Sequence, residues 1–383
     1  MIFKRLHLVT LLVFRLISAH SLLAQSINFE LLNTFEVPAK IGEKNLFIGI
    51  SGLVYSQYNS ILYAVSDDSG YNKPNNDARM FDLSLSVQEG KVIGKLRAGN
   101  PIYLKDEQNH MMKHGELDLE GIAFTRDGKL LIVSEQDING YFEYPPKLYL
   151  FNKTGTLLKT FNFPKKFSPT GTVHAHSGCV RNKCFEGLSR IPSQDHFVAI
   201  VEKPLVQEKE TELLRFLKFS LPSESDKEIH TVEEYAYKMD SLEKALTDGN
   251  KKISVGVSDL LALNEVDFLT IERSYIQYNN KPSASIIRVY KTQCNKCTDI
   301  KSNEKILDAN QIKPMEKELV LDLSKVQNLD GKYFNFLNIE GISWGPYIDG
   351  HPTIIFANDN TTDSETANEH IDPTYFMIFK TNL

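Results

Sequence analysis

The sequence predicts an all-β protein, a β-propeller of five four-stranded blades arranged in a ring, and three observations support this prediction. One pattern of a small or acidic residue, a Gly or Asp, an apolar run, a turn and a second apolar run occurs five times. The copies are almost evenly spaced, and further strand-like runs follow them. Because four short antiparallel strands make one propeller blade, this repetition favours a ring of blades.

The repeat defines two sets of equivalent positions. The second residue of each copy is Ser51, Glu120, Glu186, Ser258 or Glu340, and these positions are separated by 69, 66, 72 and 82 residues. The second apolar run of each copy ends at Asp67, Glu135, Glu202, Glu272 or Asn358. The two sets lie close enough in each copy for the apolar runs to form one antiparallel hairpin per blade.

Two further strand-like runs follow each of the first four copies. They cover residues 78–83 and 91–97, 147–151 and 157–163, 213–219 and 231–237, and 285–291 and 318–323. The last copy is followed only by 375–379, whereas 27–37 precedes the first copy and has no repeat of its own. We expect this N-terminal strand to complete the last blade, which would close the ring and remove its exposed edges.

The long segments 204–256 and 291–338 leave an alternative open, because either could hide a sixth, degenerate blade. Within the first of them, residues 223–250 are polar with apolar side chains at roughly helical spacing. This spacing predicts an inserted surface helix, although it overlaps the strand-like run 231–237.

The composition is that of a globular protein. The chain has 383 residues, of which 42% are hydrophobic and 24% charged, which excludes disordered, collagen-like and coiled-coil classes. The formal net charge of −6 argues against nucleic acid as a partner. Any anion that the protein binds therefore needs a local site.

The N-terminal segment predicts export. Lys4 and Arg5 precede the apolar stretch 6–23, and small or polar residues follow it. We interpret residues 1–24 as a signal peptide and residues 25–383 as one propeller domain, periplasmic or secreted, monomeric and without stable membrane insertion after cleavage. An N-terminal membrane anchor is the alternative.

The four cysteines form two close pairs, Cys179 with Cys184 and Cys294 with Cys297. In an oxidising compartment this spacing predicts two local disulfides. A zinc site built from all four thiolates is the alternative.

The motifs SGLVYS, DLEGIAF, FEGLSRIP and IEGISW, with VSDLLAL in fourth place, resemble the phytase-like β-propeller family, which is described as having esterase-like activity of phytase. The resemblance covers nearly all of the chain after the predicted signal peptide and follows the order of the repeats. It implies a propeller fold, an exported and mostly bacterial protein, and a phosphoester or ester hydrolase.

The first set of positions predicts a metal ring. The innermost strands of a propeller face its axis, so Glu120, Glu186 and Glu340 should meet in a narrow channel and repel one another. A bound hard cation would resolve this conflict, and calcium suits a set of oxygen ligands that also includes Asp67 and Ser51. Neither set contains His or Cys, which disfavours zinc. Alternatively, each Glu accepts hydrogen bonds that clasp neighbouring blades together.

The second set predicts an acidic rim with catalytic carboxylates Glu135 and Glu202. Lys203, Arg273 and Arg79 would hold an anionic substrate beside them, although a salt-bridge network at the blade ends is the alternative. His176, with His174 nearby, is a candidate general base or ligand, and a solvated loop histidine is the alternative.

No motif for a nucleophilic serine, a P-loop, a dinucleotide site or an H-E-x-x-H zinc site occurs in the sequence. The leading hypothesis is therefore a calcium-dependent hydrolase of phosphate esters or other small anionic esters that uses metal-activated water. The alternatives are a non-catalytic, calcium-stabilised propeller that binds a ligand or partner, and a lactonase-like metal propeller.

Overall fold

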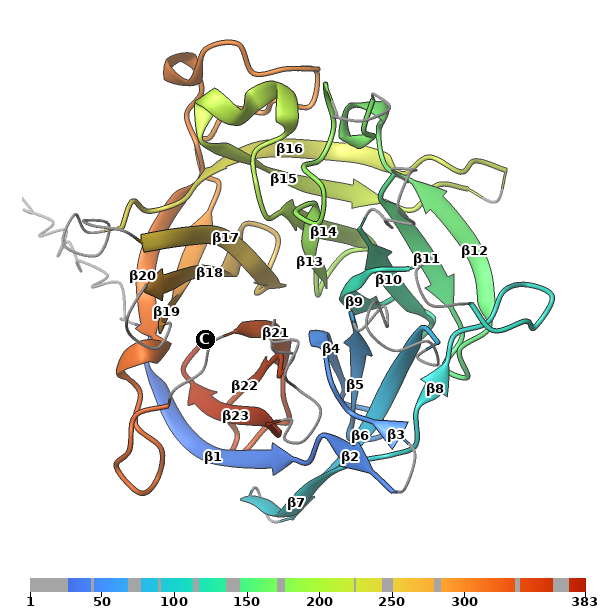
Figure 1. Cartoon of the computed structure of the whole chain (residues 1–383), viewed down its shortest axis with the longest axis vertical. Helices are drawn as coiled ribbons and strands as arrows, with labels where there is room; N and C mark the ends of the chain where they lie inside the picture. The colour runs from blue at the N-terminus through green and yellow to red at the C-terminus, as the bar shows by residue number, and fades with distance from the viewer. Residues whose placement is uncertain are drawn as a thin grey trace, which may run out of the picture.

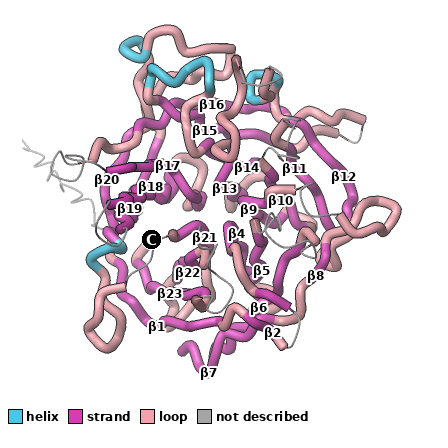
Figure 2. Tube along the Cα trace, viewed as in Figure 1, coloured by secondary structure: helices cyan, strands magenta, loops and turns pink. Residues whose placement is uncertain are grey.

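Five antiparallel sheets are arranged around a common axis in the computed structural model of the chain (Figure 1). Strands form the ring and short 3₁₀ helices lie at its periphery (Figure 2). The predicted five-bladed propeller is confirmed, and the six-bladed alternative is wrong. The structure describes residues 27–42, 45–67, 77–88, 91–112, 117–135, 145–170, 176–223, 225–242, 251–278, 284–334, 338–360 and 372–383.

Each blade starts with its innermost strand and runs outward. Blade 1 contains β4 (Ile50–Ser56), β5 (Ile61–Ser66), β6 (Arg79–Gln88) and β7 (Lys91–Ala98), with β8 (Ile102–Tyr103) paired to β6. Blade 2 contains β9 (Leu119–Phe124), β10 (Leu130–Ser134), β11 (Lys147–Phe151) and β12 (Leu157–Asn162). Blade 3 contains β13 (Phe185–Arg190), β14 (His196–Val201), β15 (Leu213–Ser220) and β16 (His230–Lys238).

Blade 4 contains β17 (Lys251–Ala262), β18 (Asp267–Tyr278), β19 (Ala284–Gln293) and β20 (Glu316–Asp322). Blade 5 contains β21 (Ile339–Trp344), β22 (Thr353–Asn358), β23 (Thr374–Thr381) and, as its outermost strand, β1 (Phe29–Val37). A small hairpin of β2 (Lys40–Ile41) and β3 (Asn45–Leu46) follows β1. The 3₁₀ helices are η1 (Lys165–Phe167), η2 (Val206–Thr211), η3 (Ala309–Gln311) and η4 (Leu323–Lys325).

The N-terminal strand closes the ring as the sequence predicted. β1 runs antiparallel to β23, with Phe35 opposite Phe376. One blade thus combines strands from both ends of the chain, so that any loosening of the ring must break this sheet. The predicted signal peptide, residues 1–24, lies outside the described residues.

The second strand of a blade lies between neighbouring blades and is apolar on both faces. β10, with the sequence LLIVS, is buried along its whole length, and β14 is buried from its second residue onward. Such continuous apolar runs suit strands that are covered on both sides. Aromatic rings fill the space between blades 2 and 3, where Phe163 stacks on Phe185 with ring centroids 4.0 Å apart.

The inserted helix predicted over 223–250 is wrong for the residues that the structure describes. β16 occupies His230–Lys238 and pairs with β15, Tyr235 lying opposite Phe216. The apolar side chains fit both a helical and a strand pattern, and pairing with the exposed edge of β15 decides between them. Residues 243–250 lie outside the described residues.

Both predicted disulfides are present. Cys179 is bonded to Cys184 and Cys294 to Cys297, which leaves no free cysteine. The four-thiolate zinc site is therefore wrong. Among the described residues, none of the helices has the length and apolar character needed to cross a membrane.

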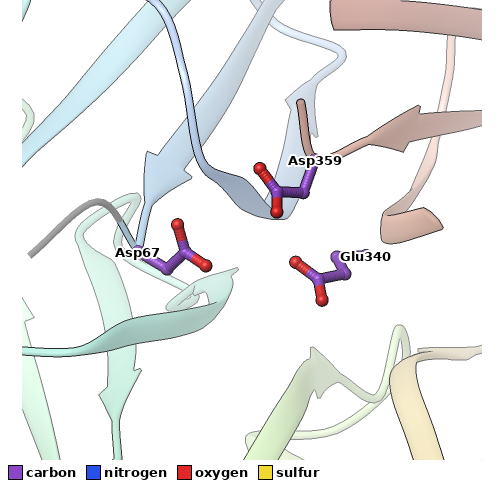
Figure 3. Close-up of side chains that lie close together, drawn as sticks. All are labelled: Asp67, Glu340 and Asp359. Atoms are coloured by element: carbon purple, nitrogen blue, oxygen red, sulfur yellow. The ribbon is translucent and has the colours of Figure 1, made fainter. Parts of the chain in front are cut away.

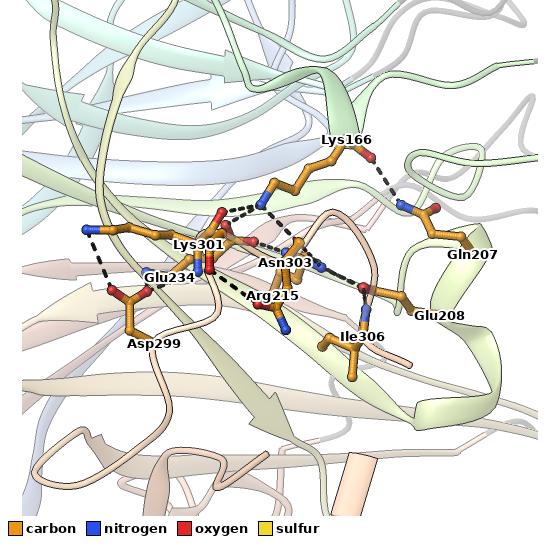
Figure 4. Close-up of polar contacts among 10 residues, drawn as sticks. Lys166, Gln207, Glu208, Arg215, Glu234, Asp299, Lys301, Asn303 and Ile306 are labelled. Atoms are coloured by element: carbon orange, nitrogen blue, oxygen red, sulfur yellow. Dashed lines mark hydrogen bonds and ion pairs between the residues drawn. The ribbon is translucent and has the colours of Figure 1, made fainter. Parts of the chain in front are cut away.

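A buried ion network fastens the long connections to blade 3 (Figure 4). Arg215 on β15 is fully buried and contacts the carboxylates of Glu208 on η2, at 2.6 Å, and Glu234 on β16. Lys166 lies 3.0 Å from Glu234, and Arg215 also donates to the carbonyl of Asn303 at 2.9 Å. The second long segment, 291–338, is thus partly a loop that covers the outer edge of blade 3.

We expect Arg215→Ala to lower the free energy of unfolding by about 3–5 kcal/mol, because it leaves two buried carboxylates without their shared partner. Arg126→Ala provides the control, since the Arg126–Asp195 pair is exposed and should contribute less than about 1 kcal/mol. Urea unfolding of both variants measures the difference. Equal losses would mean that the buried network does not stabilise blade 3.

Candidate functional site

A β-bulge occurs at the same place in all five blades. The pairing of the first two strands skips a residue at Ser51 in blade 1, and the same irregularity recurs at Glu120, Glu186, Ser258 and Glu340. A bulge bends a strand and redirects its side chain. The first set of repeat positions is therefore the set of bulge residues, which explains why the sequence marks it so clearly.

The glycine after the bulge permits neighbouring blades to approach closely. A Cβ atom at Gly52 would lie 2.2 Å from the carbonyl oxygen of Glu120 in the next blade. Blade 4 carries Asp259 at this position instead, and the Asp259 carboxylate accepts from the backbone N–H of Ile342 in blade 5 at 2.8 Å. The Gly or Asp of the repeat thus serves contact between inner strands.

The two bulge serines act as clasps between blades. Ser51 Oγ donates to the carbonyl of Leu119 at 2.7 Å, and Ser258 Oγ donates to the carbonyl of Ile339 at the same distance. These clasps come from serine hydroxyls, and the alternative in which each Glu clasps the neighbouring blade stays a prediction. The role of Ser51 as a metal ligand stays a prediction.

The second set of repeat positions was assigned one residue too early in blades 4 and 5. In four blades the residue after the second strand donates its N–H to the carbonyl of the residue that stands two positions before the bulge. In blade 4 the residue two positions before the bulge is Gly256, and Arg273 lies opposite it. The equivalent residues are therefore Asp67, Glu135, Glu202, Arg273 and Asp359.

Glu272 and Asn358 stand one position earlier in the chain. Because successive side chains of a strand point to opposite faces, a shift of one residue removes both from the rim. Glu272 instead accepts from Tyr237 Oη at 2.6 Å and from the N–H of Asp240 at 3.1 Å. Asn358 accepts from the N–H of Tyr375.

One group of carboxylates joins blades 1 and 5. Single carboxylate oxygens of Asp67, Glu340 and Asp359 all lie within 4.8 Å of one another, and their side chains converge on a common space (Figure 3). Asn338 Nδ2 donates to Glu340 at 2.8 Å and to Asp359 at 3.2 Å. Arg273 donates to Glu340 at 2.9 Å.

A second group lies in blade 2. Oxygens of Asp118, Glu120 and Glu135 also lie within 4.8 Å of one another. Burial, followed by the charges of Glu186 and Asp118, raises the pKa of Glu120 well above its ordinary value. Burial and the charge of Asp118 do the same to the pKa of Glu135. The carboxyl groups of Glu120 and Glu135 would therefore hold protons in the absence of a cation.

Glu186 and Glu202 in blade 3 connect the two groups. Burial and the charge of Glu135 raise the pKa of Glu186 well above its ordinary value. Glu202 is only 1% exposed, and its carboxylate faces two cationic side chains. Lys183 Nζ lies 2.7 Å from one of these oxygens and Arg273 3.8 Å from the other.

Three cationic side chains, those of Lys183, Lys203 and Arg273, lie among these carboxylates. Burial alone would lower the pKa of Arg273, but Glu340, Glu202 and Glu186 outweigh it and hold the guanidinium protonated. Burial lowers the pKa of Lys203, whose Nζ donates to the carbonyl of Val255.

The residues present fit a hard divalent cation. The two groups offer carboxylate oxygens alone, without His or Cys, and such donors suit calcium rather than zinc.

Most of the predicted site residues meet at this end of the channel. They are Asp67, Glu120, Glu135, Glu186, Glu202, Lys203, Arg273 and Glu340. Arg79 lies on β6, the third strand of blade 1, buried with its guanidinium 5.8 Å from the ring centroid of Phe81. His176 is exposed in the loop before Cys179, and His174 lies outside the described residues.

Sequence reasoning missed Asp118, Asn338 and Lys183. Asp118 and Asn338 stand two residues before a bulge glutamate and pair across the hairpin with Glu135 and Asp359. A third set of repeat positions, two residues before each bulge, would have revealed both. Lys183 could not be found in this way, because it reaches the site through a loop outside the repeat.

The opposite end of the channel has a different chemistry. A cavity of about 190 Å³ lies there, lined by Leu53, Ile122, Leu188, Leu261 and Ile342 among others. None of its described lining residues is acidic. The converging carboxylates and this cavity therefore occupy different ends of the ring.

Comparisons with known proteins identify one family and several similar solved structures. The family model described as "Phytase-like: Esterase-like activity of phytase" matches residues 45–361. No curated protein sequence matches the chain.

Three of the similar solved structures span almost the whole ring. A luciferin-regenerating enzyme is 10% identical, with 90% of this chain and 94% of that chain covered and a TM-score of 0.39. Virginiamycin B lyase from Staphylococcus aureus is 12% identical, with 93% and 100% covered and a TM-score of 0.34. The periplasmic gluconolactonase of Pseudomonas aeruginosa is 9% identical, with 91% and 95% covered and a TM-score of 0.34.

The raised pKa values predict how calcium-free protein responds to pH. Glu120, Glu135 and Glu186 keep protons in the folded state that the unfolded chain loses near its ordinary pKa of 4.5. The folded state then binds more protons, so the free energy of unfolding should fall as pH rises from about 5 to about 8.

Calcium should suppress this fall and release protons on binding. Thermal unfolding with chelator and with calcium, and calorimetric titration in buffers of different ionisation enthalpy, measure the two effects. A melting temperature that rises with pH in chelator would contradict the proposed protonation.

Proposed function

The chain belongs to the phytase-like family, and on that premise we propose that it is an exported, calcium-dependent hydrolase of phosphate esters or other small anionic esters. The observation that carries the proposal is the pair of converging carboxylate groups beside the buried Glu202 carboxylate. Such an arrangement suits catalysis by water at a metal centre.

Calcium, when bound, would polarise the phosphoryl oxygen and lower the pKa of a water molecule. The residues that would hold it are Asp67, Glu340 and Asp359. Asp118, Glu120 and Glu135 form a second candidate set. Asn338 orients the first set, because its amide donates to two of the three carboxylates.

The chain's own charges supply the remaining chemistry. Glu202, paired with Lys183, can take the proton of the attacking water as the water oxygen bonds to phosphorus. The bond between phosphorus and the ester oxygen then breaks, the leaving oxygen takes a proton from solvent water, and Glu202 returns its proton to the solvent. Arg273 holds the anionic group of the substrate, because its neighbours keep it charged. Lys203 lies beside it as a further donor.

Several features support export as part of the proposal. Two disulfides suit an oxidising compartment, and residues 1–24 have the pattern of a signal peptide preceding a domain of residues 25–383. Periplasm or extracellular space is the expected location. Pairing of β1 with β23 completes blade 5 within one chain, which supports a monomer.

A non-catalytic role is the second candidate, and the clasps favour it. Ser51, Ser258 and Asp259 use their polar side chains for hydrogen bonds to neighbouring blades. Arg273 is paired with Glu340. A propeller that needs calcium only for stability, and that binds a ligand or partner, would show the same contacts.

Hydrolysis by the mature chain separates the two candidates. We expect turnover of a phosphate monoester or phytate that disappears after chelation and returns with calcium. Carboxylic esters and lactones are assayed in parallel, and turnover of lactones alone would replace the phosphoester proposal by a lactonase. If all substrates stay intact while calcium still raises the melting temperature, the non-catalytic role is correct.

We expect Glu202→Gln to lower kcat by about 10²–10⁴-fold, because the amide cannot accept the proton of water. The variant should remain folded, because the amide oxygen can still accept from Lys183 Nζ, but its melting temperature should fall with the loss of this ion pair.

Glu272→Gln is the matched control, because this buried carboxylate lies in the next blade and contacts Tyr237 and Lys317 instead of the rim. Steady-state kinetics and circular dichroism of both variants measure the difference. Equal losses of kcat in the two folded variants would exclude Glu202 as the base.

A further inference from the structure

The loop CVRNKC, residues 179–184, leads directly into β13 and its bulge residue Glu186. The disulfide between Cys179 and Cys184 closes the loop, and both residues are buried. Inside it, the N–H of Lys183 donates to the carbonyl of Val180 at 3.1 Å. The loop is thus a short closed turn beside the carboxylates of the site.

Cys184 contacts both predicted catalytic carboxylate residues through its backbone. Its N–H donates to Glu135 Oε1, which comes from the end of β10 in blade 2. Its carbonyl accepts from the N–H of Glu202, at the end of β14 in blade 3, at 2.6 Å. One residue of the loop therefore joins the two blades at the site.

Lys183 adds a charge to this arrangement. Its Nζ lies 2.7 Å from Glu202 Oε2, and the side chain is partly buried. Burial alone would lower the pKa of Lys183, but Glu202 and Glu186 outweigh that effect and raise it. The lysine therefore stays an ammonium, and its contact fixes the position of the Glu202 carboxylate.

The other end of the loop is anchored in the core. The N–H of Cys179 donates to the carbonyl of Phe167 at 3.0 Å, and Phe167 is fully buried. The disulfide connects this anchor to Cys184. Without the bond, Lys183 and Cys184 would be held only by the turn and by their contacts with the carboxylates.

We propose that the Cys179–Cys184 loop is part of the functional site: it holds the Cys184 amide on Glu135 and makes Lys183 a positioning residue for Glu202. This inference rests on the proposed function. It gives the Cys179–Cys184 disulfide a role in the site beyond stabilising the fold. Groups that orient metal ligands and catalytic carboxylates typically change affinity or activity by about 10–100-fold when removed.

The second disulfide provides a matched control. Cys294 and Cys297 lie in the connection after β19, and the segment that follows packs on the outer strand of blade 3 through Ile300 and Met315. Removing it should affect stability of that connection without reaching the carboxylates.

The first test replaces the charge. We expect Lys183→Met to lower kcat at least tenfold and to weaken calcium binding, with little change in KM. Lys183→Arg should recover most of both, because a guanidinium can also pair with Glu202. If Lys183→Met is folded and retains wild-type kcat and calcium affinity, Lys183 has no positioning role and the proposal is wrong.

The second test removes the bond. We expect the double variant Cys179→Ser/Cys184→Ser to lose at least tenfold in kcat and in calcium affinity by calorimetry. Cys294→Ser/Cys297→Ser should stay within about twofold of the wild type. Equal losses of kcat and calcium affinity in the two double variants would mean that the Cys179–Cys184 disulfide only stabilises the fold, and would overturn the proposal.

Amide hydrogen exchange separates this proposal from the proposed function. The Cys184 amide should exchange slowly in the wild type and at least tenfold faster at position 184 in the Cys179→Ser/Cys184→Ser variant, with no change in the Cys294→Ser/Cys297→Ser variant. If the wild type neither binds calcium nor hydrolyses any ester, the proposed function fails, while exchange still decides whether the loop holds Glu135. Unprotected exchange at Cys184 in the wild type would overturn the loop's role.

Discussion

The mutual repulsion of buried carboxylates at one end of the channel is the constraint on which the rest of the site depends. Burial, and then the charges of neighbouring carboxylates, raises the pKa of Glu120, Glu135 and Glu186. Spreading of the ring would break the hydrogen bonds that Ser51 and Ser258 make between inner strands. Protons, cationic side chains or a metal ion must therefore neutralise the group.

The repeating part of the structure could be predicted from the sequence because the same physical requirement recurs in every blade. Each inner strand needs a bulge and a small residue at the point of closest approach, so the pattern survives even where Glu is replaced by Ser258. The closing role of β1 followed from counting strands at both ends. These features depend on local sequence and on the number of strands.

The parts that were missed depend on register and on loops. Glu272 was aligned with Glu202 by its place at the end of an apolar run, but the hairpin places Arg273 there. One residue decides between a carboxylate and a guanidinium in the rim, and strand periodicity alone does not fix that choice when both faces are buried. Lys183 arrives through a disulfide loop that no repeat describes. The helix expected over 223–250 was wrong because an edge strand with helical spacing can still pair.

Unequal blades give the ring a direction. Blades 5, 1 and 2 contribute the converging carboxylates Asp359, Asp67 and Glu135, whereas Arg273 and Lys203 come from blades 4 and 3. This division suits an anionic substrate bound beside a metal ion. The acidic half would hold the metal, and the basic half would hold the negative charge of the substrate. Glu202 stands at the boundary, between Lys183 and Arg273. A symmetric ring of five identical carboxylates could bind an ion, but it could not orient a substrate beside that ion. The departures from the repeat are therefore the residues that would convert a stabilising metal ring into a site with chemistry.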